Sequence, residues 1–242
     1  MALMRIDKFL ADAGIGTRSE IKSYIKKGAV QVNGILIQKP DMKIETAKDS
    51  VTFQSERIYM DDFEYYLLNK PAGYVSATAD NTAPTVLSLI ESRRKDLFPV
   101  GRLDKDTEGL LLITNDGALS HRLLSPRHHV DKTYYAIVEG NVNERDIHLF
   151  SQGLVIGDED FVKALPARLS IVADYNIEEN LSYINITIQE GKFHQIKRMF
   201  QAVGKKVIYL KRISFGGLTL PENLPLGKYR RLTEAELELL KK

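Results

Sequence analysis

The chain has 242 residues, a net charge of +2, 43% hydrophobic and 27% charged residues, the composition of an ordinary globular protein of one or two domains. It contains no cysteine, which excludes disulfide bonds, thiolate catalysis and every cysteine-ligated metal site. Because no apolar run is long enough for a signal peptide or a membrane span, we expect a cytoplasmic protein with no membrane partner.

Two short helices are predicted at the start of the chain. Ile6, Phe9 and Leu10 recur at the spacing of a buried helical face. The second helix begins after Thr17, which stands three residues before Glu20 in the pattern of a capping box.

A β-hairpin follows in VQVNGILI, residues 30–37. Apolar residues alternate on both sides of Asn33 and Gly34, the dipeptide that best fits a type I′ turn. The basic residues of this region stand largely off the apolar positions and could form one face, although scattered solubilising residues would give the same pattern. They are Arg5, Lys8, Arg18, Lys22, Lys26 and Lys27.

The periodicity weakens from about residue 40 to residue 62, apart from a strand in SVTF at residues 50–53. We place a domain boundary near residue 60. Residues 1–60 then form a small domain with its linker, and residues 61–242 form a larger one.

The larger domain is predicted to be α+β, with a mixed, mainly antiparallel sheet flanked by helices. Runs rich in Thr, Tyr, Ile and Val predict strands at residues 65–68, 109–114, 132–140, 168–174, 182–191 and 206–220. Helical patterns occupy residues 85–94, 118–124, 193–204 and 231–242. The last of these begins with Thr233 and Glu236 in capping-box spacing.

Charge is distributed unevenly along this domain. Residues 192–231 contain ten Lys or Arg and one acid, Glu222, although the whole chain carries only +2. Such a segment indicates a partner with repeated negative charge, with nucleic acid first, while a solvated basic face is the plainer alternative.

The motifs of common cofactor and metal sites are missing. Neither G-x-x-x-x-G-K-[ST] nor G-x-G-x-x-G occurs, the five histidines show no H-E-x-x-H spacing, and there is no G-x-S-x-G serine elbow. We therefore expect no cofactor and no metal, and a chemistry that depends on carboxylates, tyrosines and cations.

Two aspartates are the first candidates by position. Asp104 and Asp106 stand between the apolar segments FPV and GLLLI, while Lys132 and Tyr134 stand at the start of a later strand. On spacing alone, a plain turn that uses aspartates is the favoured interpretation.

The first sixty residues resemble the S4 RNA-binding domain in the pattern R-x-D-x-x-L…R-S…I-K-x-G-x-V-x-V-N-G. The resemblance implies an RNA-facing surface made of Arg18, Ser19, Lys22, Lys26, Lys27, Asn33 and Gly34.

Three further blocks resemble the RsuA-type pseudouridine synthases, in which an S4 domain is the usual partner of the catalytic domain. They are LNKPAGYVSA, FPVGRLDKDTEGLLLITNDGALSHRLLSPRHHVDKTYYA and EGKFHQIKRMFQAVG. The resemblance implies that Asp104 is the catalytic aspartate, Tyr134 the active-site tyrosine and Lys197 the cation that pairs with the aspartate. We expect contacts with phosphates or base edges from Arg102, Gln195 and Arg198.

The implied reaction is isomerisation of one uridine to pseudouridine in 16S ribosomal RNA, free or within an assembling small subunit. The glycosidic bond is cleaved, the base rotates, and C5 is joined to the ribose. Modification of 23S ribosomal RNA is an alternative, as are a non-catalytic RNA-binding or ribosome-assembly protein and a hydrolase that uses Asp104 with Asp106 or Glu108. With one S4 domain and one catalytic domain, we expect a monomer.

Overall fold

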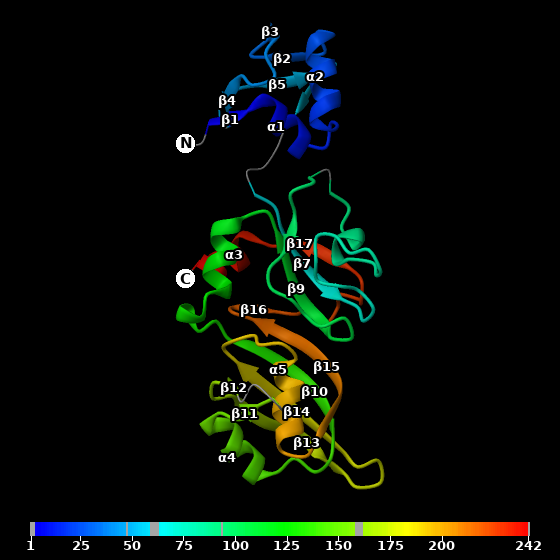
Figure 1. Ribbon diagram of the computed structural model, residues 1–242, viewed down its shortest axis with the longest axis vertical. Helices are drawn as coiled ribbons and strands as arrows, with labels where there is room; N and C mark the ends of the chain where they lie inside the picture. The colour runs from blue at the N-terminus through cyan, green and yellow to red at the C-terminus, as the bar shows by residue number, and fades with distance from the viewer. Residues whose placement is uncertain (1–2, 47, 59–62, 93, 158–161, 242) are drawn as a thin grey trace. The chain divides into compact units, whose positions relative to one another are not determined.

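The computed structural model describes residues 3–46, 48–58, 63–92, 94–157 and 162–241. The chain forms two compact units, Met1–Glu64 with Ile90–Leu97, and Tyr65–Leu89 with Phe98–Lys242 (Figure 1). The domain boundary predicted near residue 60 lies outside the described residues, which leave out residues 59–62.

The first unit consists of two helices packed on short strands. The helices are α1 (Ile6–Asp12) and α2 (Arg18–Lys26). The strands form a four-stranded sheet in the order β3-β2-β5-β6 and a separate pair of β1 with β4. Their bounds are Leu3–Arg5 (β1), Val30–Val32 (β2), Ile35–Leu36 (β3), Lys43–Glu45 (β4), Val51–Phe53 (β5) and Glu56–Ile58 (β6).

Local sequence signals account for much of this unit. Glu20 accepts a hydrogen bond from the Thr17 amide at 2.7 Å, and the Glu20 amide donates to the Thr17 hydroxyl at 3.3 Å, which confirms the capping box of α2. Asn33 (φ 53°) and Gly34 (φ 79°) both adopt left-handed backbone, as a type I′ turn requires. The predicted apolar positions of both helices are buried in one core with the strands.

The second unit is built on a nine-stranded sheet. Its main order is β13-β14-β10-β15-β9-β7-β17, with β8 paired to β9 and β16 to β15. These pairs are antiparallel except β9 with β15, which confirms a mixed, mainly antiparallel sheet. The bounds are Tyr65–Lys70 (β7), Phe98–Pro99 (β8), Glu108–Thr114 (β9), Lys132–Glu139 (β10), Arg168–Asn176 (β13), Leu181–Ile188 (β14), Lys206–Phe215 (β15), Leu218–Thr219 (β16) and Tyr229–Arg231 (β17). A separate pair joins β11 (Val155–Ile156) to β12 (Val162–Lys163).

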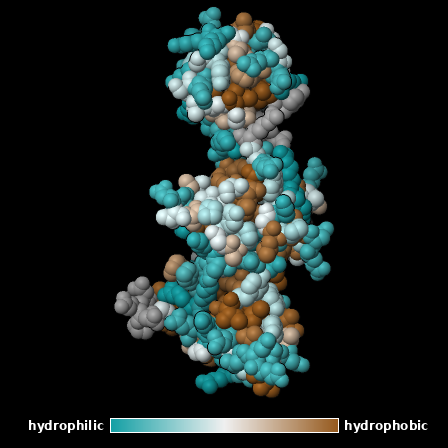
Figure 2. Space-filling model, turned by 90° about the vertical axis from the view of Figure 1, so that its right-hand side faces the viewer, coloured by the Kyte–Doolittle hydropathy of each residue, from teal (hydrophilic) through white to brown (hydrophobic). Residues whose placement is uncertain are grey.

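Four α-helices of this unit lie in the described residues: α3 (Gly117–Leu124), α4 (Glu144–Gln152), α5 (Gln195–Ala202) and α6 (Glu234–Lys241). Helix α5 packs on β15, α4 on β13, and α3 on α6. Figure 2 shows hydrophobic residues in separate patches among hydrophilic ones on the face in view, as folded proteins commonly leave apolar area exposed. In the described part of the chain, no helix has the length and apolar character that crossing a membrane requires.

The helix predicted at residues 85–94 is wrong. Among the described residues of this segment, the structure forms only a short 3-10 helix, at Val86–Leu89. The Arg94 amide donates to the Ser92 hydroxyl at 3.0 Å, where an α-helix would use the carbonyl oxygen of residue 90. A serine side chain here competes with the helical backbone bond.

Helix α4 has no counterpart among the predicted elements. Asn143 and Asp146 form a capping box at its start, and Phe150 on its inner face is fully buried. The capping pattern was therefore present in the sequence, followed by too few apolar positions to indicate a helix by periodicity.

A single glycine lets two strands meet beside the loop that precedes β9. Gly109 in β9 lies next to Arg212 in β15, and a Cβ atom there would stand 2.2 Å from the Arg212 carbonyl oxygen. Gly109 also has a φ of +100°, a backbone conformation that favours glycine. The close approach brings the loop that carries Asp104 next to β15 and β10.

Candidate active site

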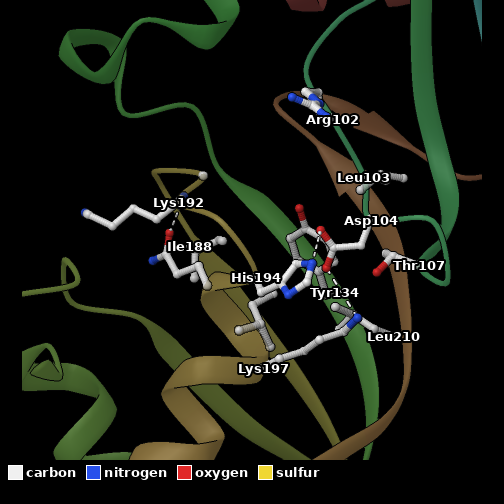
Figure 3. Close-up of a pocket in the computed structure, with 13 residues that line it drawn as sticks. Arg102, Leu103, Asp104, Thr107, Tyr134, Ile188, Lys192, His194, Lys197 and Leu210 are labelled. Carbon is white, nitrogen blue, oxygen red and sulfur yellow. Dashed lines mark hydrogen bonds and ion pairs between the residues drawn. The ribbon is translucent and has the colours of Figure 1, made fainter. Parts of the chain in front are cut away.

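A pocket opens where the loop before β9, strand β10, the end of β14 and the start of α5 come together (Figure 3). Its cavity volume is about 60 Å³, well below that of an enclosed small-ligand site, so the pocket is a shallow hollow that is open to solvent. Among its lining residues are five of those predicted from the sequence: Arg102, Asp104, Tyr134, Gln195 and Lys197.

A buried lysine holds the loop that carries Asp104. The Lys70 ammonium, 0% exposed, donates hydrogen bonds to the carbonyl oxygens of Thr107 (2.7 Å), Asp104 (3.1 Å), Pro71 (3.1 Å) and Lys105 (3.2 Å). Burial lowers the pKa of Lys70 to about 8, although nearby carboxylates offset part of this effect. Since three of these carbonyl oxygens belong to Asp104, Lys105 and Thr107, one buried cation holds the backbone of the loop in place.

Sequence reasoning did not single out Lys70. The available signal was a lysine inside the apolar run YYLLNKP, where a charged side chain is rarely buried without partners.

Two cationic or ionisable groups face the Asp104 carboxylate. Lys197 Nζ lies 3.4 Å from one oxygen and His194 Nε2 lies 3.7 Å from the other. Figure 3 shows the Asp104 carboxylate between these two side chains, next to Tyr134. The side chain is 26% exposed, so the carboxylate stands in the pocket rather than in bulk solvent.

Lys197 is shared with a second carboxylate. It donates to both oxygens of Asp106, at 2.6 and 2.8 Å, although the Asp106 side chain is 72% exposed. Burial raises the pKa of Asp106, but the hydrogen bond and charge of Lys197 outweigh this and hold the pKa below its ordinary value. Because an ion pair this exposed is worth little, Lys197 can turn fully to Asp104 at small cost.

Tyr134 supplies an aromatic wall. It lies in the middle of the sheet, between Ile186 of β14 and Arg212 of β15, and is 7% exposed. Ile188 and Leu210 add apolar surface to the same pocket. The pocket thus combines aromatic and aliphatic surface with a carboxylate and a cation, which suits a base attached to a polar sugar.

The predicted RNA contacts at this site differ in their surroundings. Arg102 is exposed at the pocket, whereas the Arg198 guanidinium donates to the carbonyl oxygens of Phe193 and Ile156 at 3.4 and 3.3 Å. At least two N–H groups of Arg198 are therefore used inside the protein, where they hold the loop before α5.

Gln195 requires a correction. The sequence predicts an RNA contact, but its side chain is 4% exposed and both ends of its amide are used inside the protein. Its oxygen accepts from the Lys192 amide at 3.0 Å, and its nitrogen donates to Glu190 at 2.9 Å. Gln195 therefore orders the preceding loop instead of presenting a free donor.

The residues predicted to face RNA in the first unit are exposed: Arg18, Ser19, Lys22, Lys26, Lys27, Asn33 and Gly34. Arg18, Lys22 and Lys26 recur every four residues along α2 and share its outer face. The Asn33 amide group is bonded to Asp49 and to the Ser50 amide, both at 2.8 Å, so its side chain builds the turn.

The basic segment at residues 192–231 does not form one free cationic surface. Arg212 is 2% exposed, and Lys205 and Arg230 form ion pairs with carboxylates at 3.0 and 2.6 Å. The net charge of residues 192–231, counted from the sequence, is therefore larger than the positive charge that a partner could contact. Among the described residues, no three His, Asp or Glu side chains are grouped so that they could hold a metal ion.

Comparisons with known proteins agree with the geometry. The family profile "RNA pseudouridylate synthase" matches residues 64–202, and that of the S4 domain matches residues 4–51. YtzG of Bacillus subtilis, an "uncharacterized RNA pseudouridine synthase", is 44% identical over 239 residues, which cover 98% of each chain. The "ribosomal small subunit pseudouridine synthase A" of Haemophilus influenzae is 38% identical over 99% of this chain and 100% of its own.

A solved structure described as a "crystal structure of pseudouridylate synthase" aligns over 98% of this chain and 99% of its own, with 37% identity and a TM-score of 0.67. Since the family profile covers more than half of the chain and full-length relatives reach 38% and 44% identity, the chain belongs to the RNA pseudouridylate synthases of the RsuA type, which isomerise uridine to pseudouridine in RNA.

Proposed function

We propose that this chain converts one uridine of 16S ribosomal RNA to pseudouridine, with Asp104 as the catalytic carboxylate. The observation that carries the catalytic part is the Asp104 carboxylate held between Lys197 and His194, beside the buried ring of Tyr134. The small-subunit target rests on full-length similarity to the Haemophilus influenzae enzyme, whose name specifies the small ribosomal subunit.

The reaction needs an ionised carboxylate near the ribose. The bond from C1′ to N1 breaks, the uracil rotates, C5 bonds to C1′, and the C5 proton leaves. An ionised Asp104 has two routes, attack on C1′ or removal of a ribose proton that leads through a glycal. In both routes the Lys197 ammonium, 3.4 Å away, attracts the negative charge of the carboxylate and helps to hold it in place.

Tyr134 has two parts in this scheme. Its ring, 7% exposed in the pocket wall, stacks on the extruded uracil. Its hydroxyl exchanges a proton near C5 as the base reattaches, since a phenol can serve as an acid or as a base.

Base extrusion has to be offset by contacts elsewhere. Flipping a nucleotide out of a stack costs a few kcal/mol. Arg102 at the pocket is an exposed cation that can bind a phosphate near the target, and Arg18, Lys22 and Lys26 on α2 are exposed cations that can bind phosphates elsewhere in the RNA. The cytoplasmic location and the monomeric state predicted from the sequence remain part of this proposal.

Tritium release tests the function. Transcripts of 16S and 23S ribosomal RNA labelled at C5 of uridine are incubated with wild-type protein, Asp104→Asn and Asp106→Asn. We expect release from 16S RNA only, with unchanged RNA mass, loss of release in Asp104→Asn, and near wild-type release in Asp106→Asn.

Each rival gives a different result. A hydrolase that uses both aspartates would free uracil and would fail in either variant. A non-catalytic RNA-binding protein would bind the transcripts without releasing tritium. Release from 23S RNA alone would overturn the substrate assignment, and equal release by Asp104→Asn would overturn the catalytic one.

A further inference from the structure

Two aromatic rings are stacked beside the catalytic carboxylate, and the mechanism above does not use them as a pair. The rings of Phe193 and His194 lie 3.8 Å apart, with an angle of 19° between their planes. The Phe193 residue is 75% exposed. His194 connects this exposed ring to the site, because its Nε2 lies 3.7 Å from an Asp104 oxygen.

The backbone beneath the two rings is held in place. His194 adopts left-handed backbone, with φ 48° and ψ 33°, immediately before α5. A residue other than glycine rarely adopts this conformation unless the surrounding structure enforces it.

The surroundings provide that enforcement. The buried Gln195 side chain bonds the Lys192 amide at 3.0 Å and Glu190 at 2.9 Å, and the Arg198 amide donates to the His194 carbonyl oxygen at 2.9 Å. The ring pair is therefore presented by a fixed loop, which reduces the entropy lost when a ligand binds.

The chemistry around the rings favours a nucleobase as the occupant. One face of Phe193 is covered by His194 and the residue remains largely exposed, so a further planar ring can extend the stack. Lys192 and Lys197 are paired with carboxylates, Lys192 with Glu190 and Lys197 with Asp104 and Asp106. Arg102, exposed at the same pocket, is a cation that can bind a phosphate. Exposed aromatic rings next to cations are the common means of binding single-stranded nucleic acid.

The occupant belongs beside the target uridine rather than in its place. His194 lines the pocket together with Asp104 and Tyr134, whereas Phe193 does not. Phe193 thus lies outside the pocket, stacked on a residue that lines it.

We propose that Phe193, backed by His194, stacks on the unpaired base of a nucleotide adjacent to the target uridine and so holds the RNA in register for base extrusion. This inference rests on the proposed function. The two can be tested separately: tritium release by the wild-type protein tests the function, and the change in KM when the Phe193 ring is removed tests the stacking contact.

The first experiment compares tritium-release kinetics of wild type, Phe193→Ala, Phe193→Trp and Ile177→Ala on the 16S transcript. Loss of one stacked base is expected to raise KM about 5- to 100-fold in Phe193→Ala, with kcat changed less. Phe193→Trp should keep KM within about twofold, because it retains a stacking ring. Ile177, 80% exposed in the same unit, is a matched control for loss of an exposed apolar side chain.

The second experiment removes the base from the RNA. Once the modified uridine is mapped, a synthetic fragment receives an abasic sugar at each neighbouring position in turn. At one position the abasic substrate should raise KM for wild type but not for Phe193→Ala. Removing the base and removing the Phe193 ring abolish the same stacking contact, so the second change has no further effect.

The outcomes are distinct. An unchanged KM in Phe193→Ala, or abasic effects that are the same in wild type and Phe193→Ala at both neighbours, overturns the stacking proposal while the enzyme assignment stands. Phe193→Ala that loses a protein partner but keeps RNA kinetics would also overturn it. Wild-type protein without tritium release overturns the function and the inference together.

Discussion

Replacing Lys197 by methionine tests the electrostatic arrangement on which the proposed mechanism depends. Methionine keeps most of the length and apolar volume of the lysine stem but removes the charge. Asp104 would lose its cation at 3.4 Å, and Asp106 would lose its hydrogen-bond donor at 2.6 Å.

The size of the effect follows from the distance and the exposure. For two unit charges separated by 3.4 Å, the attraction is about 5 kcal/mol at an effective dielectric constant of about 20 and about 1 kcal/mol in bulk water. Both side chains are 26% exposed, which places the pair between these limits, at about 2 kcal/mol. A loss of this size in transition-state stabilisation lowers kcat/KM about 30-fold.

The assay is tritium release measured from about pH 5 to pH 9 for wild type, Lys197→Met and Lys197→Arg. Without the cation, the negative charge at Asp104 is less well stabilised, so the kcat/KM of Lys197→Met should fall by about 30-fold across this pH range. Lys197→Arg retains a cation and should keep most of the activity, with any loss due to the different shape of the guanidinium.

A Lys197→Met enzyme with wild-type kcat/KM across this pH range would refute the reasoning. Equal losses in Lys197→Met and Lys197→Arg would show that the shape of the lysine matters and its charge does not.

Three further predictions concern other parts of the molecule. Tyr134→Phe keeps the ring and should lower kcat about 10²- to 10⁴-fold with KM little changed, whereas an unchanged kcat would remove the hydroxyl from the mechanism. In the first unit, replacing Lys26 and Lys27 by Gln should weaken RNA binding and reduce the slope of log affinity against log salt by up to about 2, measured by filter binding; an unchanged slope would place neither on a phosphate. The Arg230 guanidinium lowers the pKa of Glu236 to about 2, so its stabilisation of the folded state is complete above the ordinary value and is lost as pH falls towards 2. Glu236→Gln should therefore lower the free energy of unfolding by about 1 to 2 kcal/mol at pH 7, after discounting for exposure, and by nearly nothing at pH 2, and equal losses in denaturant titrations at both pH values would contradict this.

Local sequence patterns predicted much of the fold, because helix caps and tight turns depend on interactions between residues that are close in the sequence. The capping box at Thr17 and the turn at Asn33 and Gly34 depend on neighbouring backbone groups, and both are confirmed. The helix predicted at residues 85–94 failed for the opposite reason. Its residues up to Leu89 belong to one compact unit and those from Ile90 belong to the other, so the segment does not pack as one continuous helical face.

The resemblance to RsuA-type enzymes predicts Asp104, Tyr134 and Lys197 as catalytic residues from the sequence. The structure places all three around one pocket, although they come from a loop, a strand and a helix far apart in the sequence. Their roles stay predictions until the variants are measured. Without the resemblance, the spacing of residues around Asp104 predicts only an aspartate in a turn.

Residue order along the chain was enough to predict the two domains, the strand-rich second unit, the family and the candidate catalytic residues. Three features became visible only in the folded chain: Lys70 holds the backbone of the Asp104 loop, the Gln195 amide is bonded inside the protein, and Asp106 shares the cation of Asp104. These features depend on which side chains become buried and which charges meet when distant segments pack together. A one-dimensional pattern carries no such information.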